Sequence, residues 1–498
     1  MLFNSYTFIF LFVPLTLLLT GLARRFGGVR GASAILVAAS LFFYAYHDIR
    51  LLALIGGSIV LNYLLTGFIF SAEGRRRYWI AVLGVVLNLA LLAYFKYTNF
   101  FLENVAALSG ADFDFKKIAL PIGISFYTFQ QVAYNTDTYS GKIKERDFLS
   151  YALFVAFFPQ LIAGPIVHHG QIIKQFASDA FGRIKWENIL IGASIFGLGL
   201  FSKKILADTF AGYATPIFVA ADQGDAVSFL MAWKGSLSYT FQIYFDFAGY
   251  STMAIGLGRM FGVKLPTNFF SPYKSTNIIE FWRRWHITLS TFLKDYLYIA
   301  MGGNRKGKAR RWFNLLATMV LGGLWHGASW NFVIWGTLHG LYLVINHAWN
   351  MLTKKVAPLG RMQKTTAWKL VGWLITFIAV VAAWVGFRAV TLGGNLSLLS
   401  SMFGFKGLGD MGADLATLDL KFWLFLTAGF LIALGMPNMA QIFGTVRATY
   451  EEHGPAKAFG LITISYRPNL IWTTAMAIIA AIAVFYLSPT TEFLYWAF

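Results

Sequence analysis

The sequence predicts an all-α polytopic membrane protein, and three observations point to this class. Of its 498 residues, 57% are hydrophobic and only 13% are charged, whereas soluble domains carry about a quarter charged residues. The mean hydropathy is +0.60. Apolar runs of about 20 residues, long enough for a helix to cross a bilayer, recur from end to end. We therefore expect one membrane domain over residues 1–498.

The first apolar stretch indicates a retained helix rather than a signal peptide. It covers 2–22 and is followed by Arg24, Arg25 and Arg30, whereas a cleavable signal carries its positive charge before the apolar region. Because cytoplasmic loops collect Lys and Arg, we expect the N-terminus outside. Further spans are expected at 31–47, 51–70 and 78–99.

The remaining apolar segments bring the expected number of transmembrane helices to about eleven. Residues 264–311 differ, because polar residues interrupt the aromatic ones. Polar backbone cannot face lipid, so this stretch must be re-entrant, interfacial or packed in protein. We divide the domain into N-terminal helices (1–117), a catalytic core (118–350) and C-terminal helices (351–498). The later apolar segments are 118–139, 148–166, 187–212, 227–262, 312–324, 328–349, 367–387, 421–442 and 470–488.

The charge balance and the missing cysteine exclude several classes of function. Lys and Arg number 41 against 22 acidic residues, for a net charge of +19. In a soluble protein this would indicate nucleic acid, but short basic cytoplasmic loops explain it here, and no nucleic-acid partner is expected. No cysteine is present, which excludes disulfides, thiolate metal ligands and a Cys-linked acyl intermediate.

Two histidines are candidates for catalysis. His326 lies between Gly322-Gly323-Leu324-Trp325 and Gly327 in a long apolar stretch, where an ionisable residue is a functional-site hypothesis by default. A neutral imidazole suits proton abstraction from a hydroxyl, and flanking glycines allow close approach. Alternatively, His326 is a core histidine bonded to a neighbouring helix. His286, forty positions earlier, is either a second catalytic or orienting group or part of an interfacial Trp and Arg belt.

A metal site is not expected. His326 and His339 are thirteen residues apart, which on one helix separates them by about 220°. No His-Glu-x-x-His pattern occurs, and that spacing is what places two histidine ligands on one helix face.

A basic loop at 302–311 nearly matches a phosphate-binding loop. Ala309 stands where that motif needs Ser or Thr to hold Mg²⁺, so we do not expect an NTPase site. The loop is either a cytoplasmic topology signal or a patch that attracts an anionic cofactor such as the phosphates of coenzyme A. The basic candidates for such contacts are Arg283, Arg284, Arg305, Lys306 and Lys308.

An acidic residue also lies in a nearly uncharged span. Asp246 follows Tyr244, and such a carboxylate normally pairs inside the bundle. We expect it to pair with Arg283 or Arg284, with a substrate or proton-relay role as the alternative. Asp246, Tyr244, Trp325 and Asp295 are structural or tunnel-lining candidates.

Taken together, these stretches resemble the membrane-bound O-acyltransferase family, in its bacterial polysaccharide O-acetyltransferase branch. The opening MLFNSYTFIFLFVPL and YFKYTNFF (94–101) are also similar to that branch, so the likeness covers most of the chain. Five ordered blocks carry it: LPIGISFYTFQ (120–130), FFPQLIAGPI (157–166), YFDFAGYSTMAIGLGRMFG (244–262), NFFSPYKSTNIIEFWRRWHITLSTFLKDYLYIAMGGNRKG (268–307) and GGLWHGASWNFVIWGTLHG (322–340).

The resemblance implies helices around a central funnel or tunnel, with His326 near its middle as general base or acceptor-positioning residue. It implies a supporting role for His286, although many relatives have Asn or Asp at the second position. Relatives of this type take acetyl from cytoplasmic acetyl-CoA and work in the bacterial inner membrane with a periplasmic acetyltransferase of the SGNH-hydrolase type. Alginate, peptidoglycan, cellulose and other exopolysaccharides are the acceptors that the branch offers.

Two other functions remain open from the residues. A transporter or channel also has many spans and intramembrane Asp and His, although the polar residues here gather in one central third. An acyltransferase acting on a lipid or protein hydroxyl would need a deep apolar slot for a long acyl chain.

Overall fold

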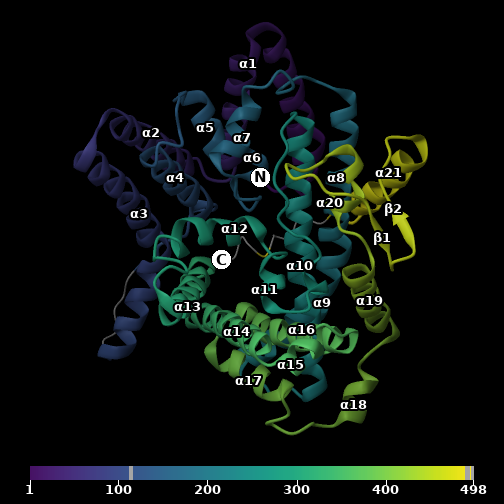
Figure 1. Ribbon diagram of the computed structural model, residues 1–498. Helices are drawn as coiled ribbons and strands as arrows, with labels where there is room; N and C mark the ends of the chain where they lie inside the picture. Colours follow the sequence, from purple (N-terminus) through teal and green to yellow (C-terminus); the bar gives the residue numbers. More distant parts are fainter. Residues whose placement is uncertain (111–115, 488–493, 495–498) are drawn as a thin grey trace.

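The chain folds into an almost entirely helical body (Figure 1), as the composition predicts. The computed structural model describes residues 1–110, 116–487 and 494. The expected last span, 470–488, is the helix α21 (Leu470–Phe485), and position 488 lies outside the described residues. The only sheet in the described part is the hairpin of β1 (Ala456–Ala458) and β2 (Ile462–Ile464), paired antiparallel.

The other elements follow in chain order. The N-terminal third contains η1 (Phe8–Phe12), α1 (Val13–Ala45), α2 (Arg50–Ser71), α3 (Gly74–Ser109), α4 (Ile124–Tyr139), α5 (Phe148–Ala156), α6 (Phe158–Leu161) and α7 (His169–Phe176). The middle contains α8 (Trp186–Phe201), η2 (Ser202–Ala207), α9 (Asp208–Gln223), α10 (Phe229–Met260), η3 (Pro272–Lys274), α11 (Ile278–Trp282), α12 (Ile287–Phe292), η4 (Leu293–Tyr298), α13 (Gly307–His326) and α14 (Trp330–Lys355). The last third contains α15 (Ala357–Met362), α16 (Thr366–Arg388), α17 (Leu392–Met402), α18 (Met411–Ala416), α19 (Leu420–Phe430), η5 (Leu431–Gly435), α20 (Met439–Ile442) and η6 (Gly444–Val446).

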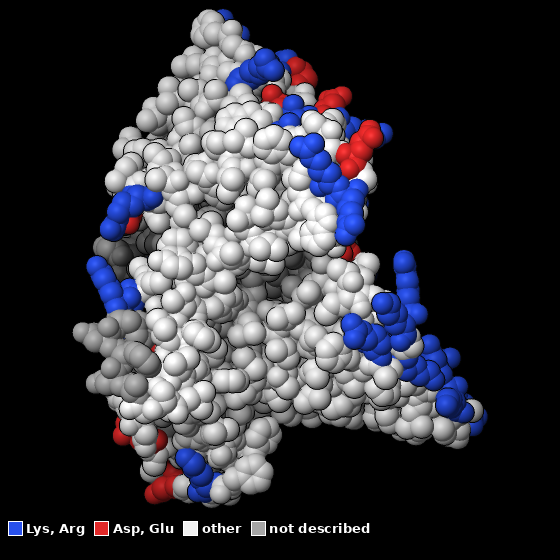
Figure 2. Space-filling model, turned by 90° about the vertical axis from the view of Figure 1, so that its left-hand side faces the viewer, with Lys and Arg blue, Asp and Glu red and all other residues white. Residues whose placement is uncertain are grey.

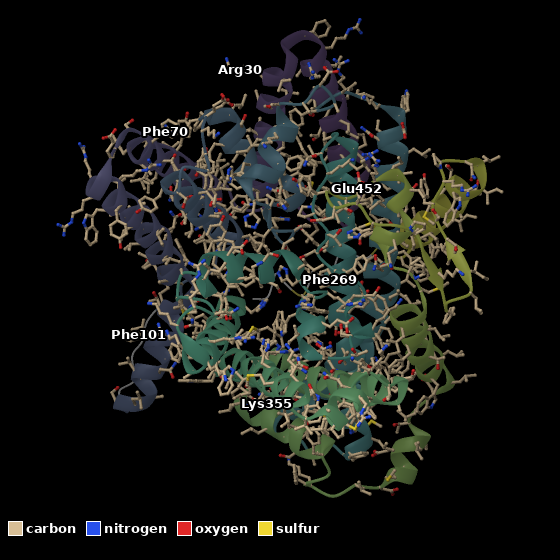
Figure 3. All side chains as sticks on the ribbon, in the orientation of Figure 1. Arg30, Phe70, Phe101, Phe269, Lys355 and Glu452 are labelled. Carbon is tan, nitrogen blue, oxygen red and sulfur yellow. The ribbon has the colours of Figure 1, made fainter. Side chains whose placement is uncertain are left out.

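The first two expected spans form a helical hairpin. Gly28 has φ 64° and ψ −154°, a conformation open to glycine but strained for other residues, and the chain reverses there. The rings of Phe12 and Phe42 consequently lie 6.3 Å apart. Figure 3 places Arg30 at the tip of this hairpin, next to the turn. The predicted division between 2–22 and 31–47 is therefore confirmed.

The surface has the character of a multi-pass membrane protein. Five described helical stretches are long and apolar enough to span a bilayer, and one of them contains the reversal at Gly28. Two shorter apolar helices, Leu420–Gly435 and Leu470–Phe485, accompany them. Figure 2 shows a broad uncharged surface, with Lys, Arg, Asp and Glu gathered along its edges. The expected segment 148–166 is broken into short helices, so length alone overestimated the regular spans.

Helix α10 packs closely against α8 because glycines face each other. A Cβ on Gly249 would lie 2.8 Å from the carbonyl oxygen of Gly199, and one on Gly256 would lie 2.6 Å from that of Gly192. Small residues at this spacing let two backbones approach inside a membrane, where van der Waals packing replaces the hydrophobic effect.

Two aromatic cores meet beside α10. The first joins the N-terminal helices to the second half of α10 and includes Trp325. The second joins the first half of α10 to α14, α16 and α19 and includes Trp335 and Phe387. The junction of the two cores is where the polar candidates lie.

The interrupted stretch 264–311 forms short pieces, as expected. The elements η3, α11, α12 and η4 contain three to six residues each. Ser271 and His286 have φ values of 50° and 42°, a left-handed conformation that costs non-glycine residues about 1–2 kcal/mol. Such strain is typical of functional positions held by their surroundings.

Candidate active site

The helix that carries His326 lies tightly against its neighbour. A Cβ on Gly323 would overlap the Phe332 carbonyl oxygen, and one on Gly336 would lie 2.9 Å from the Cα of Val320. Glycine is therefore needed where α13 and α14 meet, as the flanking glycines of His326 predicted. This packing fixes the end of α13 at the junction of the two cores.

His326 is the last residue of α13 and is 4% exposed. Its imidazole lies edge-on to Trp325, with centroids 4.9 Å apart, and to Trp335 and Phe387, at 5.1 Å each. The first ring belongs to the N-terminal core and the other two belong to the C-terminal core. An imidazole thus lies where both halves of the protein enclose it.

His286 lies next to His326, with ring centroids 6.4 Å apart. It is fully buried, and its Nδ1 lies 3.0 Å from the Asn268 Oδ1. Because that oxygen only accepts, Nδ1 carries the proton and the neutral ring presents Nε2 as an acceptor. The structure therefore brings together the two histidines that the sequence singled out, forty positions apart.

Asn268 orients this pair and was not singled out as a site residue from the sequence. Its Oδ1 also accepts from the Thr288 hydroxyl at 2.9 Å, and its Nδ2 donates to the Ser251 hydroxyl at 3.0 Å. The backbone N–H of Thr288 also points at this Oδ1, at 3.4 Å, and because an N–H only donates, it fixes which end of the amide faces His286. The only available signal was an asparagine in the interrupted stretch, which did not indicate its partner.

Lys96 is a second residue without a predicted role. It lies in the middle of α3, is 7% exposed and donates to the Trp325 carbonyl oxygen and, at 3.3 Å, to that of His326. A lysine in an apolar helix normally extends its ammonium to the interface, so no sequence pattern pointed to a place at the site.

The expected partner of Asp246 was wrong. Its Oδ1 lies 2.6 Å from the Nζ of Lys203, which also reaches Asp208 at 3.0 Å. Arg284 pairs instead with Glu280, four residues earlier, at 2.6 Å. Lys203 lies on the π-helical turn η2, and the close α8 and α10 packing brings it to Asp246. Arg284, in the turn after α11, is therefore engaged by a nearby carboxylate of that helix.

The other tunnel-lining candidates lie in different places. Tyr244 borders a cavity of about 250 Å³ that also touches Asn268 and Ser251. Trp325 stacks on Phe129, with centroids 5.1 Å apart, and contacts His326. Asp295 lies at the surface, with a side chain 39% exposed and 3.5 Å from Lys294.

Comparison with known proteins identifies the family. The model of the membrane-bound O-acyltransferase family, MBOAT, matches residues 40–385. The chain belongs to this family. The peptidoglycan O-acetyltransferase of Helicobacter pylori is 43% identical over 436 residues, which cover 82% of this chain and 81% of that one. The probable alginate O-acetylase AlgI of Pseudomonas aeruginosa is 41% identical over 418 residues, covering 81% and 75%.

A more distant relative is named for the transfer of a different acyl group, D-alanyl. The teichoic acid D-alanyltransferase of Streptococcus thermophilus is 31% identical over 281 residues, covering 53% of this chain and 68% of that one. The protein is thus a multi-pass membrane acyltransferase of the MBOAT family. The two histidines, Asn268 and the end of α13 form its candidate active site.

The basic residues of the acyltransferase fall into two groups. Arg305 and Lys306 are exposed on the turn that precedes α13, Lys308 is exposed in the first turn of that helix, and Arg283 is exposed after α11. Arg284 is engaged by Glu280. Among the described residues no hydrogen bond or ion pair joins the two groups. Beyond the turn, Arg311 of α13 lies 3.0 Å from the Nδ1 of His347 on α14.

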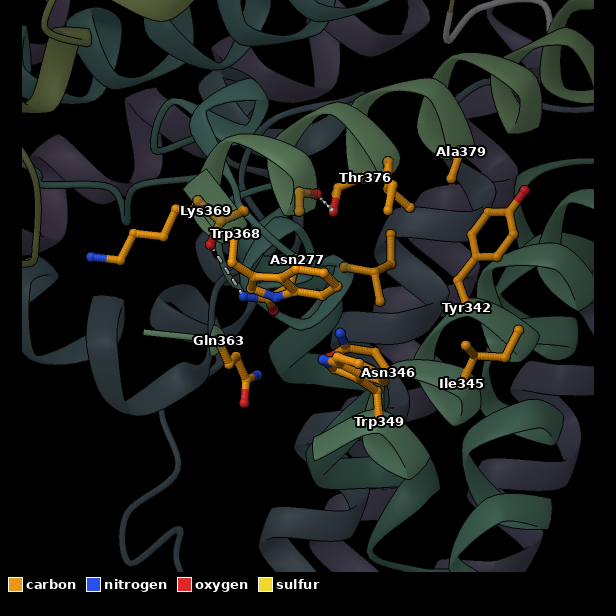
Figure 4. Close-up of a pocket in the computed structure, with 14 residues that line it drawn as sticks. Asn277, Tyr342, Ile345, Asn346, Trp349, Gln363, Trp368, Lys369, Thr376 and Ala379 are labelled. Carbon is orange, nitrogen blue, oxygen red and sulfur yellow. Dashed lines mark hydrogen bonds between the residues drawn. The ribbon is translucent and has the colours of Figure 1, made fainter. Parts of the chain in front are cut away.

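A larger cavity of about 530 Å³ lies between α14 and α16 (Figure 4) and is separate from the histidines. Its wall includes Tyr342, whose ring contacts His339, and His339 in turn contacts Trp335. These rings stand between the cavity and His326. In the described part of the chain, no three His, Asp or Glu side chains are arranged to hold a metal ion.

Proposed function

We propose that this acyltransferase takes acetyl from cytoplasmic acetyl-CoA and makes it available for O-acetylation of an exported polysaccharide. The observation that carries the proposal is the burial of His326 beside the His286 and Asn268 pair, at the junction of the two aromatic cores. A neutral imidazole in such a place has the chemistry to move a proton to and from a hydroxyl.

In the direct reaction, His326 acts as general base. It takes the proton of the acceptor hydroxyl while the oxygen attacks the thioester carbonyl, and the new C–O bond replaces the C–S bond. The proton then passes to the departing thiolate, which leaves as CoA thiol. His286, whose Nδ1–H is held by Asn268, presents Nε2 as an acceptor and orients the acceptor hydroxyl.

A covalent relay is the other form of the same reaction. Because the chain has no cysteine, an acetyl intermediate would have to form on oxygen or nitrogen, with a hydroxyl or His326 itself as the carrier. Single-turnover labelling of the protein with radioactive acetyl-CoA separates the two forms, because only the relay leaves acetyl on the chain before an acceptor is added.

The basic turn before α13 supports a cytoplasmic donor. Arg305 and Lys306 are exposed there and Lys308 is exposed at the start of the helix, and CoA carries phosphate groups that such residues attract. We place this turn inside and the acceptor on the opposite side, in the inner membrane, with a periplasmic SGNH-type acetyltransferase as partner. The names of the relatives support an exported cell-envelope or extracellular polymer as acceptor.

The test follows acetyl from donor to polymer. Cells that lack the gene are complemented with the wild-type protein, with His326→Ala or with His453→Ala, a histidine of the C-terminal loop whose Nε2 lies 3.0 Å from the Thr267 hydroxyl. We expect polymer O-acetyl content to be restored by wild type and His453→Ala but not by His326→Ala at equal membrane abundance. Full acetylation with His326→Ala would contradict the proposal.

A further inference from the structure

The last four carbonyl oxygens of α13 receive no hydrogen bond from an N–H group within the helix, so they need donors from elsewhere. Here each has one. The Gly323 oxygen accepts from the backbone N–H of Gly327 at 3.3 Å, and the Leu324 oxygen accepts from the Tyr97 hydroxyl at 2.9 Å. The Trp325 oxygen and, at 3.3 Å, the His326 oxygen accept from the Lys96 ammonium. Two neighbouring residues of α3 therefore bind three of the four carbonyls.

The burial of the Lys96 ammonium at this position costs hydration free energy. An ammonium buried inside a membrane protein loses several kcal/mol of hydration unless it is compensated. No carboxylate of the described residues lies within ion-pair distance of Lys96. Its described contacts are the carbonyl end of α13, the Ser125 hydroxyl at 3.4 Å and the face of Trp325 at 5.8 Å. The C-terminal end of a helix carries partial negative charge, which compensates the cation.

The backbone beyond His326 supplies a donor to only one of these four carbonyls, that of Gly323, through the Gly327 N–H. Gly327 is extended, with φ −165° and ψ 150°, so the helix stops at the residue that bears the imidazole. A helix end without partners frays. The clamp from α3 lies on this last turn, and the same ammonium touches the Trp325 ring, which packs against His326 at 4.9 Å.

We propose that Lys96, together with Tyr97, is a positioning residue that clamps the end of α13 and so holds the His326 imidazole beside His286. This rests on the proposed function of His326. Lys96 donates to backbone carbonyls and does not touch the imidazole, so its effect on acyl transfer passes through His326. Its loss moves the histidine while leaving the donor site unchanged.

The test uses deletion, restoration and a matched control. Lys96→Met removes the ammonium and keeps much of the length, while Lys96→Arg restores a cation with several donors. Tyr97→Phe removes the second donor. Tyr94→Phe makes the same change three residues earlier on α3, where the ring is 56% exposed. Each variant is purified and assayed with its periplasmic partner, and acetyl transfer is measured as kcat and KM for labelled acetyl-CoA. Hydrogen exchange of peptides covering 322–330 reports the helix end independently of activity.

We expect Lys96→Met to lower kcat about 10- to 100-fold, with KM within about threefold of wild type, because misplacement of about 1 Å has such effects. Exchange at 322–330 rises in the same variant, and Lys96→Arg recovers both readouts. Tyr97→Phe shows the same changes at smaller size, and Tyr94→Phe shows neither. Wild-type kcat in Lys96→Met, unchanged exchange, or no recovery by arginine in a folded protein would overturn the proposal. If the wild-type protein transfers no acetyl, the proposed function falls, and exchange alone decides whether Lys96 clamps the helix.

Discussion

Replacing Gly323 by alanine tests how closely the active site depends on the crossing of α13 and α14. The added Cβ would lie less than 3.0 Å from the Phe332 carbonyl oxygen and 3.2 Å from both the Cα and the N of Gly336. All three are backbone atoms, so no side-chain rotation relieves the overlap. Ordinary contact begins at 3.4 Å. The two helices must therefore separate by at least 0.4 Å, the difference between 3.4 and 3.0 Å.

This separation moves His326, three residues further along the same helix. Misplacement of a catalytic group by 1 Å costs about 100-fold in rate. If the free-energy cost scales linearly with displacement, 0.4 Å costs about sixfold, so we expect kcat to fall at least about sixfold. Overpacking of this kind also costs about 1–3 kcal/mol of stability, and the melting temperature falls with it.

The assay compares acetyl transfer and thermal unfolding of Gly323→Ala with Gly57→Ala. Gly57 lies inside α2, and a Cβ there meets nothing within 4 Å. The control keeps wild-type activity and gains up to about 1 kcal/mol of helix stability. Wild-type kcat together with wild-type melting in Gly323→Ala would show that the helix crossing tolerates separation and does not set the position of His326.

Three further experiments test other parts of the account. Asn268→Ala removes the acceptor of the His286 Nδ1–H, and we expect transfer to fall about 10-fold or more, as when orienting partners of functional histidines are removed; unchanged kcat would exclude Asn268 from the site. Lys203→Met leaves Asp246 buried without its cation and should cost about 3–5 kcal/mol, measured by thermal unfolding, while Lys203→Met with Asp246→Leu recovers most of it; an equally unstable double variant would contradict this. The double variant Arg305→Glu with Lys308→Glu should raise the KM for acetyl-CoA several-fold at low salt and less at high salt, with kcat unchanged. A KM equal to that of the wild type at low salt would show that acetyl-CoA does not bind near these two residues.

The class of fold and one catalytic candidate could be predicted from the sequence because each depends on local signals. Apolar length and low charge identify membrane helices, and a histidine among glycines and tryptophans is conspicuous in an apolar stretch. The reversal at Gly28 also agrees with the basic residues next to it.

Partnerships across the fold could not be predicted in the same way. Asp246 meets Lys203 because paired glycines bring α8 against α10 and a π-helical turn displays the lysine inward. Arg284, just after α11, has a partner four residues earlier, Glu280 on that helix, and this nearby carboxylate engages it in place of a distant one. Lys96 lies more than 200 residues from the carbonyls that it binds, and no periodicity links them.

Cleavage of acetyl-CoA and transfer of its acetyl group in proteoliposomes, with wild type compared with a folded His326→Ala variant, tests the central claim most directly. The account predicts that wild type transfers the label in the presence of its periplasmic partner, while His326→Ala, with normal abundance and melting, transfers none above the uncatalysed rate. Equal transfer by the two proteins would remove His326 from the mechanism.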